Sequence, residues 1–134
     1  MIVVDVNVVA YLLIQGAKTA LARAVFTKDP SWTLPPLWQD EFLNVLVMQV
    51  RQTGFSIAVA SQTWSRALEL LLPVEQRVDK LMVLQTACQH QITAYDAQYV
   101  VLAGQLDVNL VTEDTELQRK FPRRTVSMQM FCKV

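Results

Sequence analysis

Short apolar runs alternate along the chain with longer stretches in which apolar side chains recur every three or four positions. Runs of the first kind are typical of buried strands, and the clearest, Ile2-Val3-Val4, is β-branched throughout. The pattern predicts strands at residues 2–4, 32–34, 73–75, 108–112 and 125–127. It predicts helices at about 8–14, 17–28, 37–53, 56–71, 77–90, 94–106 and 114–120. Because helices separate the strands, the strands should pair in parallel through right-handed crossovers, and the fold class is α/β.

Length and composition narrow the possibilities. With 134 residues, the chain has room for one domain, which we take as residues 1–134. Its 52% hydrophobic and 18% charged residues exclude a disordered chain. The 12 basic residues balance the 12 acidic ones, so the basic excess that marks many nucleic-acid-binding proteins is missing. The three glycines stand too far apart for a phosphate-binding loop, which excludes nucleotide binding through a glycine-rich turn.

Residues that commonly hold zinc or form disulfides are few. Cys88 and Cys132 lack a paired-cysteine spacing, and His90 is the sole histidine, so we expect two free thiols and no zinc site. A carboxylate already at Asp5 excludes a secretory signal at the start. No apolar run approaches the roughly 18 residues of a membrane span. We therefore expect a cytoplasmic protein without a membrane partner.

Acidic side chains occupy positions where burial is costly. Asp5 and Asp114 follow directly after predicted strands, while Glu41 and Asp96 lie in the first turns of predicted helices and have largely apolar neighbours. Each has a structural explanation taken alone. Asp5, or Asn7 beside it, and Asp114 would cap helices, Glu41 would favour the positive end of the helix dipole, and Asp96 would follow the N-cap Thr93.

The set of acids is more informative than its members. Ligand sites of parallel α/β sheets lie outside the carboxyl ends of the strands, where Asp5 and Asp114 are expected. Carboxylates that converge there repel one another, so protons or a cation must neutralise them. Hard divalent ions take oxygen ligands, and one or two of them can activate water for attack on a phosphodiester. The pattern thus points to metal-dependent phosphoryl chemistry.

Considered together, these motifs resemble the PIN domain, a family of small metal-dependent ribonucleases. The matching pieces follow the family's order and are IVVDVNVV, EFLNVL, YDAQYVVLA and LVTEDTEL. The resemblance covers residues 1 to about 127 and implies a three-layer α/β/α fold with a parallel five-stranded sheet. It also implies hydrolysis of RNA with Mg²⁺ or Mn²⁺, leaving a 5′-phosphate.

Carried over by position, the resemblance assigns site residues. The catalytic and metal-binding acids would be Asp5, Asp96 and Asp114, with Glu41 a direct or water-mediated ligand. Asn7 and Thr112 match polar positions that support such a site by hydrogen bonding. Many members of this length are VapC-like toxins of toxin–antitoxin pairs, so the resemblance further implies a homodimer and a cognate antitoxin protein.

A basic run follows the last acidic motif. Arg119, Lys120, Arg123 and Arg124 could hold RNA phosphates near the metal site. The alternative is an ordinary solvated helix end and loop. Separately, the nearly all-apolar segment 42–50 predicts a buried helix, in the core or at a homodimer surface.

Two other functions are compatible with parts of the pattern. The segment Asp5-Val6-Asn7-Val8-Val9 loosely resembles the strand end of haloacid-dehalogenase-type phosphatases, with Asp5 as nucleophile. However, Asn7 cannot transfer the proton that this chemistry requires, and the chain is short for that fold. The second alternative is a non-catalytic module that binds nucleic acid or protein on a PIN scaffold, although all the expected acids are present.

Overall fold

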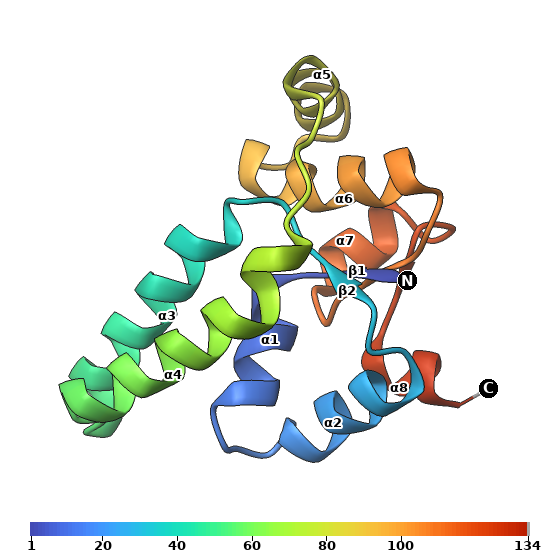
Figure 1. The fold of residues 1–134 in the computed structure, drawn as a ribbon. Helices are drawn as coiled ribbons and strands as arrows, with labels where there is room; N and C mark the ends of the chain where they lie inside the picture. Colours follow the sequence, from blue (N-terminus) through green and yellow to red (C-terminus); the bar gives the residue numbers. More distant parts are fainter. Residues whose placement is uncertain (134) are drawn as a thin grey trace.

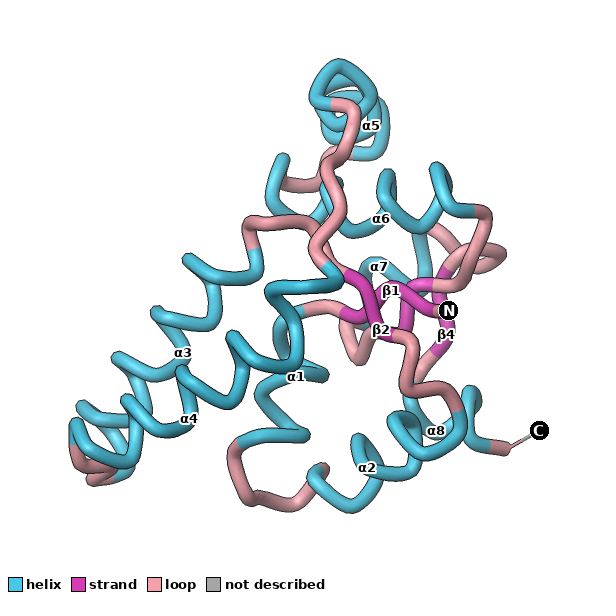
Figure 2. The backbone as a smooth tube through the Cα atoms, viewed as in Figure 1, coloured by secondary structure: helices cyan, strands magenta, loops and turns pink. Residues whose placement is uncertain are grey.

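The sheet at the centre of the molecule is parallel throughout. The computed structural model describes residues 1–133. The strands are β1 (Ile2–Val4), β2 (Trp32–Thr33), β3 (Leu110–Val111) and β4 (Thr125–Val126), in the order β2-β1-β3-β4. Figure 2 shows these short strands surrounded by helices. The predicted α/β class and parallel pairing are confirmed.

The register brings particular residues to one edge of the sheet. Val4, the last residue of β1, pairs with Val111, the last residue of β3. Parallel strands end at the same edge, so Asp5 and Thr112 leave the sheet side by side. Sheet register therefore places the start of α1 next to the segment that leads into α7.

The expected five-stranded sheet is wrong by one strand, since the described residues form four. Residues 73–75 do not make a strand. Leu72–Val74 form a short 3₁₀ helix, η1, and a single parallel bridge from Glu75 to Leu34 is all that remains of the pairing. Proline has no N–H for a sheet ladder, so Pro73 favours the helical turn.

The helices follow the predicted stretches closely. They are α1 (Val6–Leu13), α2 (Thr19–Lys28), α3 (Trp38–Thr53), α4 (Ile57–Leu71), α5 (Lys80–His90), α6 (Ala94–Leu106), α7 (Thr115–Lys120) and α8 (Met128–Cys132). The first begins earlier than predicted because Asp5 caps it. The last was not predicted; Ser127 caps it, and its first N–H is bound by Glu113, which is distant in sequence.

The helices pack on both faces of the sheet. Figure 1 shows α5 and α6 on one side and α1 and α2 on the other. Val3 and Val4 of β1 are fully buried between these layers. Residues Ala97 to Ala103 of α6 are all buried, because α6 lies between the sheet and α5. This packing holds α6 in place and with it the acidic first turn of that helix.

Helices α3 and α4 form a pair that extends from the sheet (Figure 1). An aromatic cluster of Trp38, Phe42 and Trp64 joins them near the sheet. Farther out, segment 42–50 is less buried than its composition predicts, since Leu43 is 43% and Val47 40% exposed.

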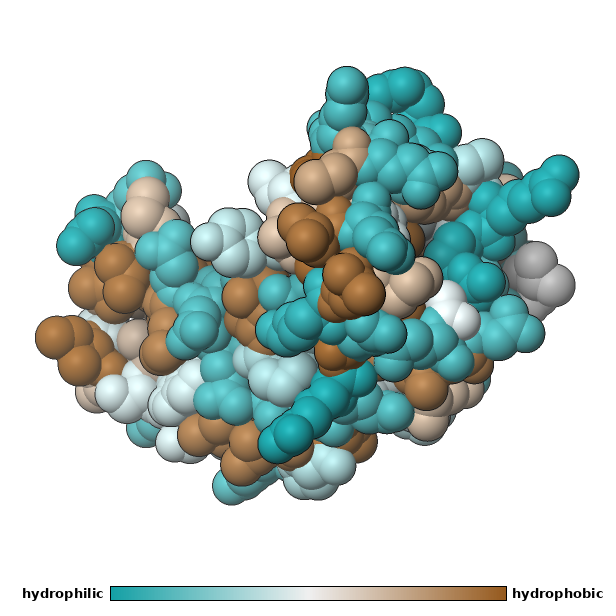
Figure 3. Space-filling view, turned by 90° about the horizontal axis from the view of Figure 1, so that it is seen from above, coloured by the Kyte–Doolittle hydropathy of each residue, from teal (hydrophilic) through white to brown (hydrophobic). Residues whose placement is uncertain are grey.

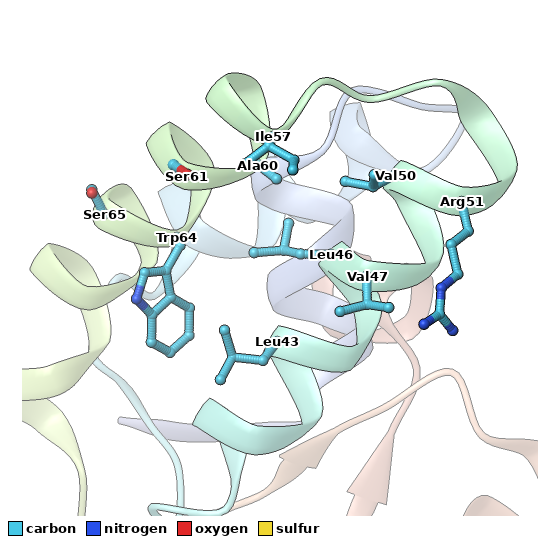
Figure 4. Close-up of a pocket in the computed structure, with 10 residues that line it drawn as sticks. All are labelled: Leu43, Leu46, Val47, Val50, Arg51, Ile57, Ala60, Ser61, Trp64 and Ser65. Carbon is cyan, nitrogen blue, oxygen red and sulfur yellow. The ribbon is translucent and has the colours of Figure 1, made fainter.

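The outer part of this pair is hollowed. Figure 4 shows side chains of α3 and α4 facing one another across an apolar groove of about 450 Å³. The residues that we call the apolar groove are Leu43, Leu46, Val47, Val50, Ile57, Ala60 and Trp64. Figure 3 shows apolar side chains gathered at the left end of the molecule, where this pair ends.

The structure also bears on disulfide bonds and on membrane-spanning helices. Cys88 and Cys132 are free thiols. Among the helices of residues 1–133, none combines the length and the apolar character needed to span a bilayer.

Candidate active site

Asp5 is the most buried of the predicted acids. It directly follows β1, and its side chain is 8% exposed. Its Oδ1 accepts hydrogen bonds from the backbone N–H groups of Asn7 at 3.1 Å and Val8 at 3.2 Å, so Asp5 caps α1. Its Oδ2 accepts a hydrogen bond from the hydroxyl of Thr112. Capping thus uses only one oxygen of this carboxylate and leaves the other to face the end of β3.

Thr112 connects Asp5 to Asp114. The hydroxyl that donates to Asp5 also accepts from the backbone N–H of Asp114 at 3.0 Å. Asp114 caps α7 through Oδ1, which accepts from the N–H of Leu117 at 3.0 Å. The amide of Gln118 donates to the carbonyl of Thr112 at 2.8 Å, which fixes the segment further. Thr112 therefore joins Asp5 to the segment that carries Asp114.

Glu41 lies in the first turn of α3 and has a partner that sequence reasoning missed. The hydroxyl of Tyr99 on α6 donates to Glu41 Oε1 at 2.6 Å. Tyr99 is only 2% exposed. The sequence pattern indicates no more than that it is one of the apolar neighbours of Asp96. A buried tyrosine hydroxyl requires a polar partner, and that requirement is the signal that could have identified it.

Asp96 lies in the first turn of α6, as predicted. Thr93 caps this helix by accepting from the N–H of Asp96 at 3.0 Å. The charges of Asp114 and Glu116 act on Asp96, so this turn lies near the start of α7. We call Asp5, Glu41, Asp96 and Asp114 the acidic edge.

Burial and repulsion disfavour the charged forms of Asp5, Glu41 and Asp96. Burial, with a smaller contribution from the charge of Asp114, raises the pKa of Asp5 to about 6 against the opposing effect of its hydrogen bonds. Burial and then Asp96 raise the pKa of Glu41, although the Tyr99 hydrogen bond lowers it. Burial, followed by the charges of Asp114 and Glu116, raises the pKa of Asp96. The acids therefore form a chain of mutually repelling groups.

No cationic side chain within residues 1–133 forms an ion pair with the acidic edge. As the side chains stand, no group of three acids, cysteines or histidines in this part of the chain is close enough to enclose one ion. One oxygen each of Glu41 and Asp114 accepts no hydrogen bond from the described residues. Carboxylate oxygens without a cationic partner are the chemical groups that a hard divalent cation binds.

Asn7 contributes differently from what the pattern suggests. Its backbone N–H donates to Asp5, whereas its side chain is exposed and makes no hydrogen bond to residues 1–133. The hydrogen bond to Asp5 thus comes from the main chain, and any residue other than proline would supply it there.

The basic run begins in α7 and ends directly before β4. It precedes β4, whose Thr125 pairs with Leu110 at the start of β3, so it lies at the opposite edge of the sheet from Asp5. Lys120 donates to the carbonyls of His90 and Gln91 and pairs with Glu116. Arg124 binds Asp107 and the carbonyl of Val108. Only Arg119 and Arg123 of this run are exposed.

Glu113, next to Asp114, is partly buried and contacts two other segments. Its Oε2 accepts from the N–H of Met128 at 3.1 Å, and its Oε1 lies 3.6 Å from Lys18 Nζ. It therefore connects α8 and the segment before α2 to the end of β3, while its neighbour Asp114 turns toward the acidic edge.

Comparisons with known proteins agree with this architecture. The crystal structure of PAE2754 from Pyrobaculum aerophilum superposes with a TM-score of 0.76 and 23% sequence identity, covering 98% of this chain and 92% of that one. It shows that the two chains share a fold. A comparison with curated protein sequences gave no match. The sequence model of the PIN domain matches residues 2–121, a span that holds every member of the acidic edge, and this chain therefore belongs to the PIN domain family.

Proposed function

We propose that this protein is a ribonuclease that hydrolyses RNA phosphodiester bonds with Mg²⁺ or Mn²⁺. The PIN fold is in general a nuclease fold, and the chain belongs to that family. The observation that carries the proposal is the acidic edge, where burial and repulsion disfavour the charged forms of Asp5, Glu41 and Asp96, and where no cationic side chain of residues 1–133 forms an ion pair.

Asp5, Asp96 and Asp114 are the proposed metal ligands, with Glu41 binding directly or through water. When bound, a divalent ion supplies an activated water and stabilises the charge that develops on the phosphate. Thr112 holds the Oδ2 of Asp5 in place, and capping of α7 fixes the orientation of Asp114. Preorganised ligands of this kind avoid the cost of rearrangement during reaction.

Glu41 and Tyr99 orient the attacking water in this proposal. Tyr99 occupies one oxygen of Glu41, which leaves Oε2 to accept a hydrogen bond from water. Burial and Asp96 raise the pKa of Glu41, which makes it a stronger base than an exposed glutamate. The water oxygen bonds to phosphorus, the P–O3′ bond breaks, and the products carry a 5′-phosphate and a 3′-hydroxyl.

We further propose that the protein acts in the cytoplasm as the toxin of a toxin–antitoxin pair and forms a homodimer. The motif resemblance supports the toxin role and the cognate antitoxin protein. The exposed apolar groove supports a protein partner, since an apolar surface of this extent is costly to leave in water.

The direct test is cleavage of a 5′-labelled single-stranded RNA in Mn²⁺ and in EDTA. We expect cleavage in Mn²⁺ with 5′-phosphate products and none in EDTA. A matched control exists in Asp79, which caps α5 by accepting from Leu81 and Met82 just as Asp5 caps α1. Asp5→Asn should abolish cleavage and Asp79→Asn should preserve it. Cleavage that persists in EDTA would overturn the proposal.

The non-catalytic alternative makes a different prediction. A PIN scaffold without a working site should bind RNA or protein and cleave nothing at any Mn²⁺ concentration. The phosphatase alternative loses its support, because the family comparison identifies a PIN domain and Asn7 points its side chain to solvent.

A further inference from the structure

Besides the apolar groove, the protein has a hollow lined by both polar and apolar side chains. It lies between the start of α3, the start of α6 and the segment that leads into α5. We call it the α3–α6 hollow; its volume is about 630 Å³. Pro36, Leu37 and Val78 provide its apolar walls. A hollow of this size with an apolar wall accommodates a flat ring system of the size of a nucleobase.

Charges at the rim of the α3–α6 hollow are predominantly positive. Arg77 and Lys80 line it and are exposed, and neither forms an ion pair within residues 1–133. Asp40, the single acid of the lining, is likewise exposed and outside the described ion pairs. The lining therefore has a net positive charge, which attracts an anion, in contrast with the acidic edge.

Gln98 is the unusual residue of this hollow. Its side chain is 9% exposed and lines the hollow, yet it makes no hydrogen bond to the part of the chain that the structure describes. Its amide atoms are open to the hollow rather than sealed in the core, since the side-chain atom that is buried without a partner among the described residues is Trp32 Nε1. The side chain offers both a donor and an acceptor to whatever occupies the hollow, which is the combination that a base edge satisfies.

The hollow and the acidic edge share two helices. On α3, Asp40 of the hollow directly precedes Glu41 of the acidic edge. On α6, Gln98 precedes Tyr99, whose hydroxyl binds Glu41. The hollow and the acidic edge are therefore formed by the same two helices, α3 and α6.

We propose that the α3–α6 hollow binds one nucleotide of the RNA substrate beside the cleaved bond. Arg77 and Lys80 hold its phosphate, the apolar walls contact the base, Gln98 hydrogen-bonds the base edge, and Asp40 accepts from a ribose hydroxyl. This inference rests on the proposed ribonuclease function and adds a determinant of sequence preference to it.

The test measures RNA binding in EDTA by fluorescence anisotropy, with four labelled homo-oligoribonucleotides of ten residues. The double variant Arg77→Gln/Lys80→Gln should bind about tenfold more weakly and reduce the salt slope of log K by about 1–2. Arg23→Gln/Arg66→Gln removes the same charge around another hollow, lined by α1, α2 and α4, and should leave both values unchanged. Equal losses in the two double variants, or no loss in the first, overturn the proposal.

Gln98→Met tests base recognition separately. Methionine keeps the length of the side chain and removes the amide, so affinity should fall for the preferred homo-oligomer more than for the others, with the salt slope unchanged. A uniform effect, or none, on the four oligomers contradicts a role in reading the base.

Cleavage in Mn²⁺ separates this proposal from the ribonuclease function. If both hold, Arg77→Gln/Lys80→Gln raises KM and preserves kcat. If the variant cleaves with an unchanged KM, the subsite is rejected and the ribonuclease stands. If binding depends on the hollow and no RNA is cleaved, the ribonuclease is rejected and the binding site stands.

Discussion

Helix α3 borders two regions of opposite character. Its first turn brings Glu41 to the acidic edge, where carboxylates are held against one another and away from water. Its outer half lines the apolar groove, where Leu43 and Val47 are exposed to water. Each region is energetically costly for a different reason. At the acidic edge the cost comes from repulsion and desolvation of the carboxylates, and at the apolar groove it comes from apolar side chains exposed to water.

The difference underlies the two binding partners that we propose. A divalent cation would offset the repulsion among the carboxylates and would leave the groove unchanged. A protein surface would cover the apolar side chains of the groove and would leave the carboxylates unchanged. Substitutions in the two regions should therefore separate cleavage from association, and each prediction below challenges or refines that separation.

The largest effect is expected from the most buried carboxylate. Asp5→Asn keeps the cap of α1, because the amide oxygen still accepts from the backbone, and removes the charge. RNA cleavage should fall on the order of 10³-fold or more. The groove substitution Leu43→Ser should change the rate by no more than about twofold. Comparable losses in the two variants would mean that the regions are not separable.

Tyr99→Phe should have the next largest effect. It removes the hydrogen bond to Glu41 and keeps the ring in the core. We expect cleavage to fall roughly 10- to 100-fold and to require more Mn²⁺, as is typical when a partner of a metal ligand is removed. Tyr95→Phe, on an exposed neighbouring tyrosine, is the matched control. An unchanged Mn²⁺ requirement in Tyr99→Phe would show that Tyr99 serves packing alone.

Stability in EDTA should depend on pH through the acidic edge. The folded protein binds the Asp5 proton with a pKa of about 6, against a model value of 3.8. Between these two values the folded state holds more protons than the unfolded one, so the free energy of unfolding decreases as pH rises. From pH 5 to pH 7 the loss from Asp5 is about 1 kcal/mol, and the raised pKa values of Glu41 and Asp96 act in the same direction.

Urea denaturation at the two pH values measures this dependence. Asp5→Asn should flatten it and stabilise the metal-free protein at pH 7. Asp79→Asn should keep the slope, since that residue caps a helix away from the acidic edge. A wild-type protein more stable at pH 7 than at pH 5 in EDTA would contradict the account.

The smallest effect on cleavage belongs to the groove. Val47→Glu places a charge among apolar side chains that are partly exposed, so the chain should still fold. If the groove forms the proposed homodimer, light scattering should show a dimer for the wild type and a monomer for the variant. Cleavage per protomer should remain within about twofold of the wild type. A variant that stays dimeric would assign the groove to a different partner.

Local patterns predicted the capping residues well. Asp5, Thr93 and Asp114 each follow an extended segment and precede a helix, and each caps that helix. Capping depends on residues two or three positions apart, so the sequence contains all the required information. The same is true of the short β-branched run that became β1.

Features that depend on distant residues were not predictable in this way. Tyr99 meets Glu41 across 58 positions, and Glu113 binds the start of α8 across 15. Lys120, in a run that could equally be a solvated helix end or a phosphate-binding segment, donates to the carbonyls at the end of α5. The strand expected at 73–75 failed because Pro73 lacks the N–H that a ladder requires. Such contacts follow from tertiary packing rather than from spacing along the chain.

Mn²⁺ titration followed by thermal unfolding tests the central claim most directly, because it measures whether the acidic edge binds a divalent cation without requiring a substrate. The account predicts that saturating Mn²⁺ raises the Tm of the wild type and of Asp79→Asn by several degrees and that Asp5→Asn shows little or no increase. An equal increase in all three proteins, or none in the wild type, would contradict it.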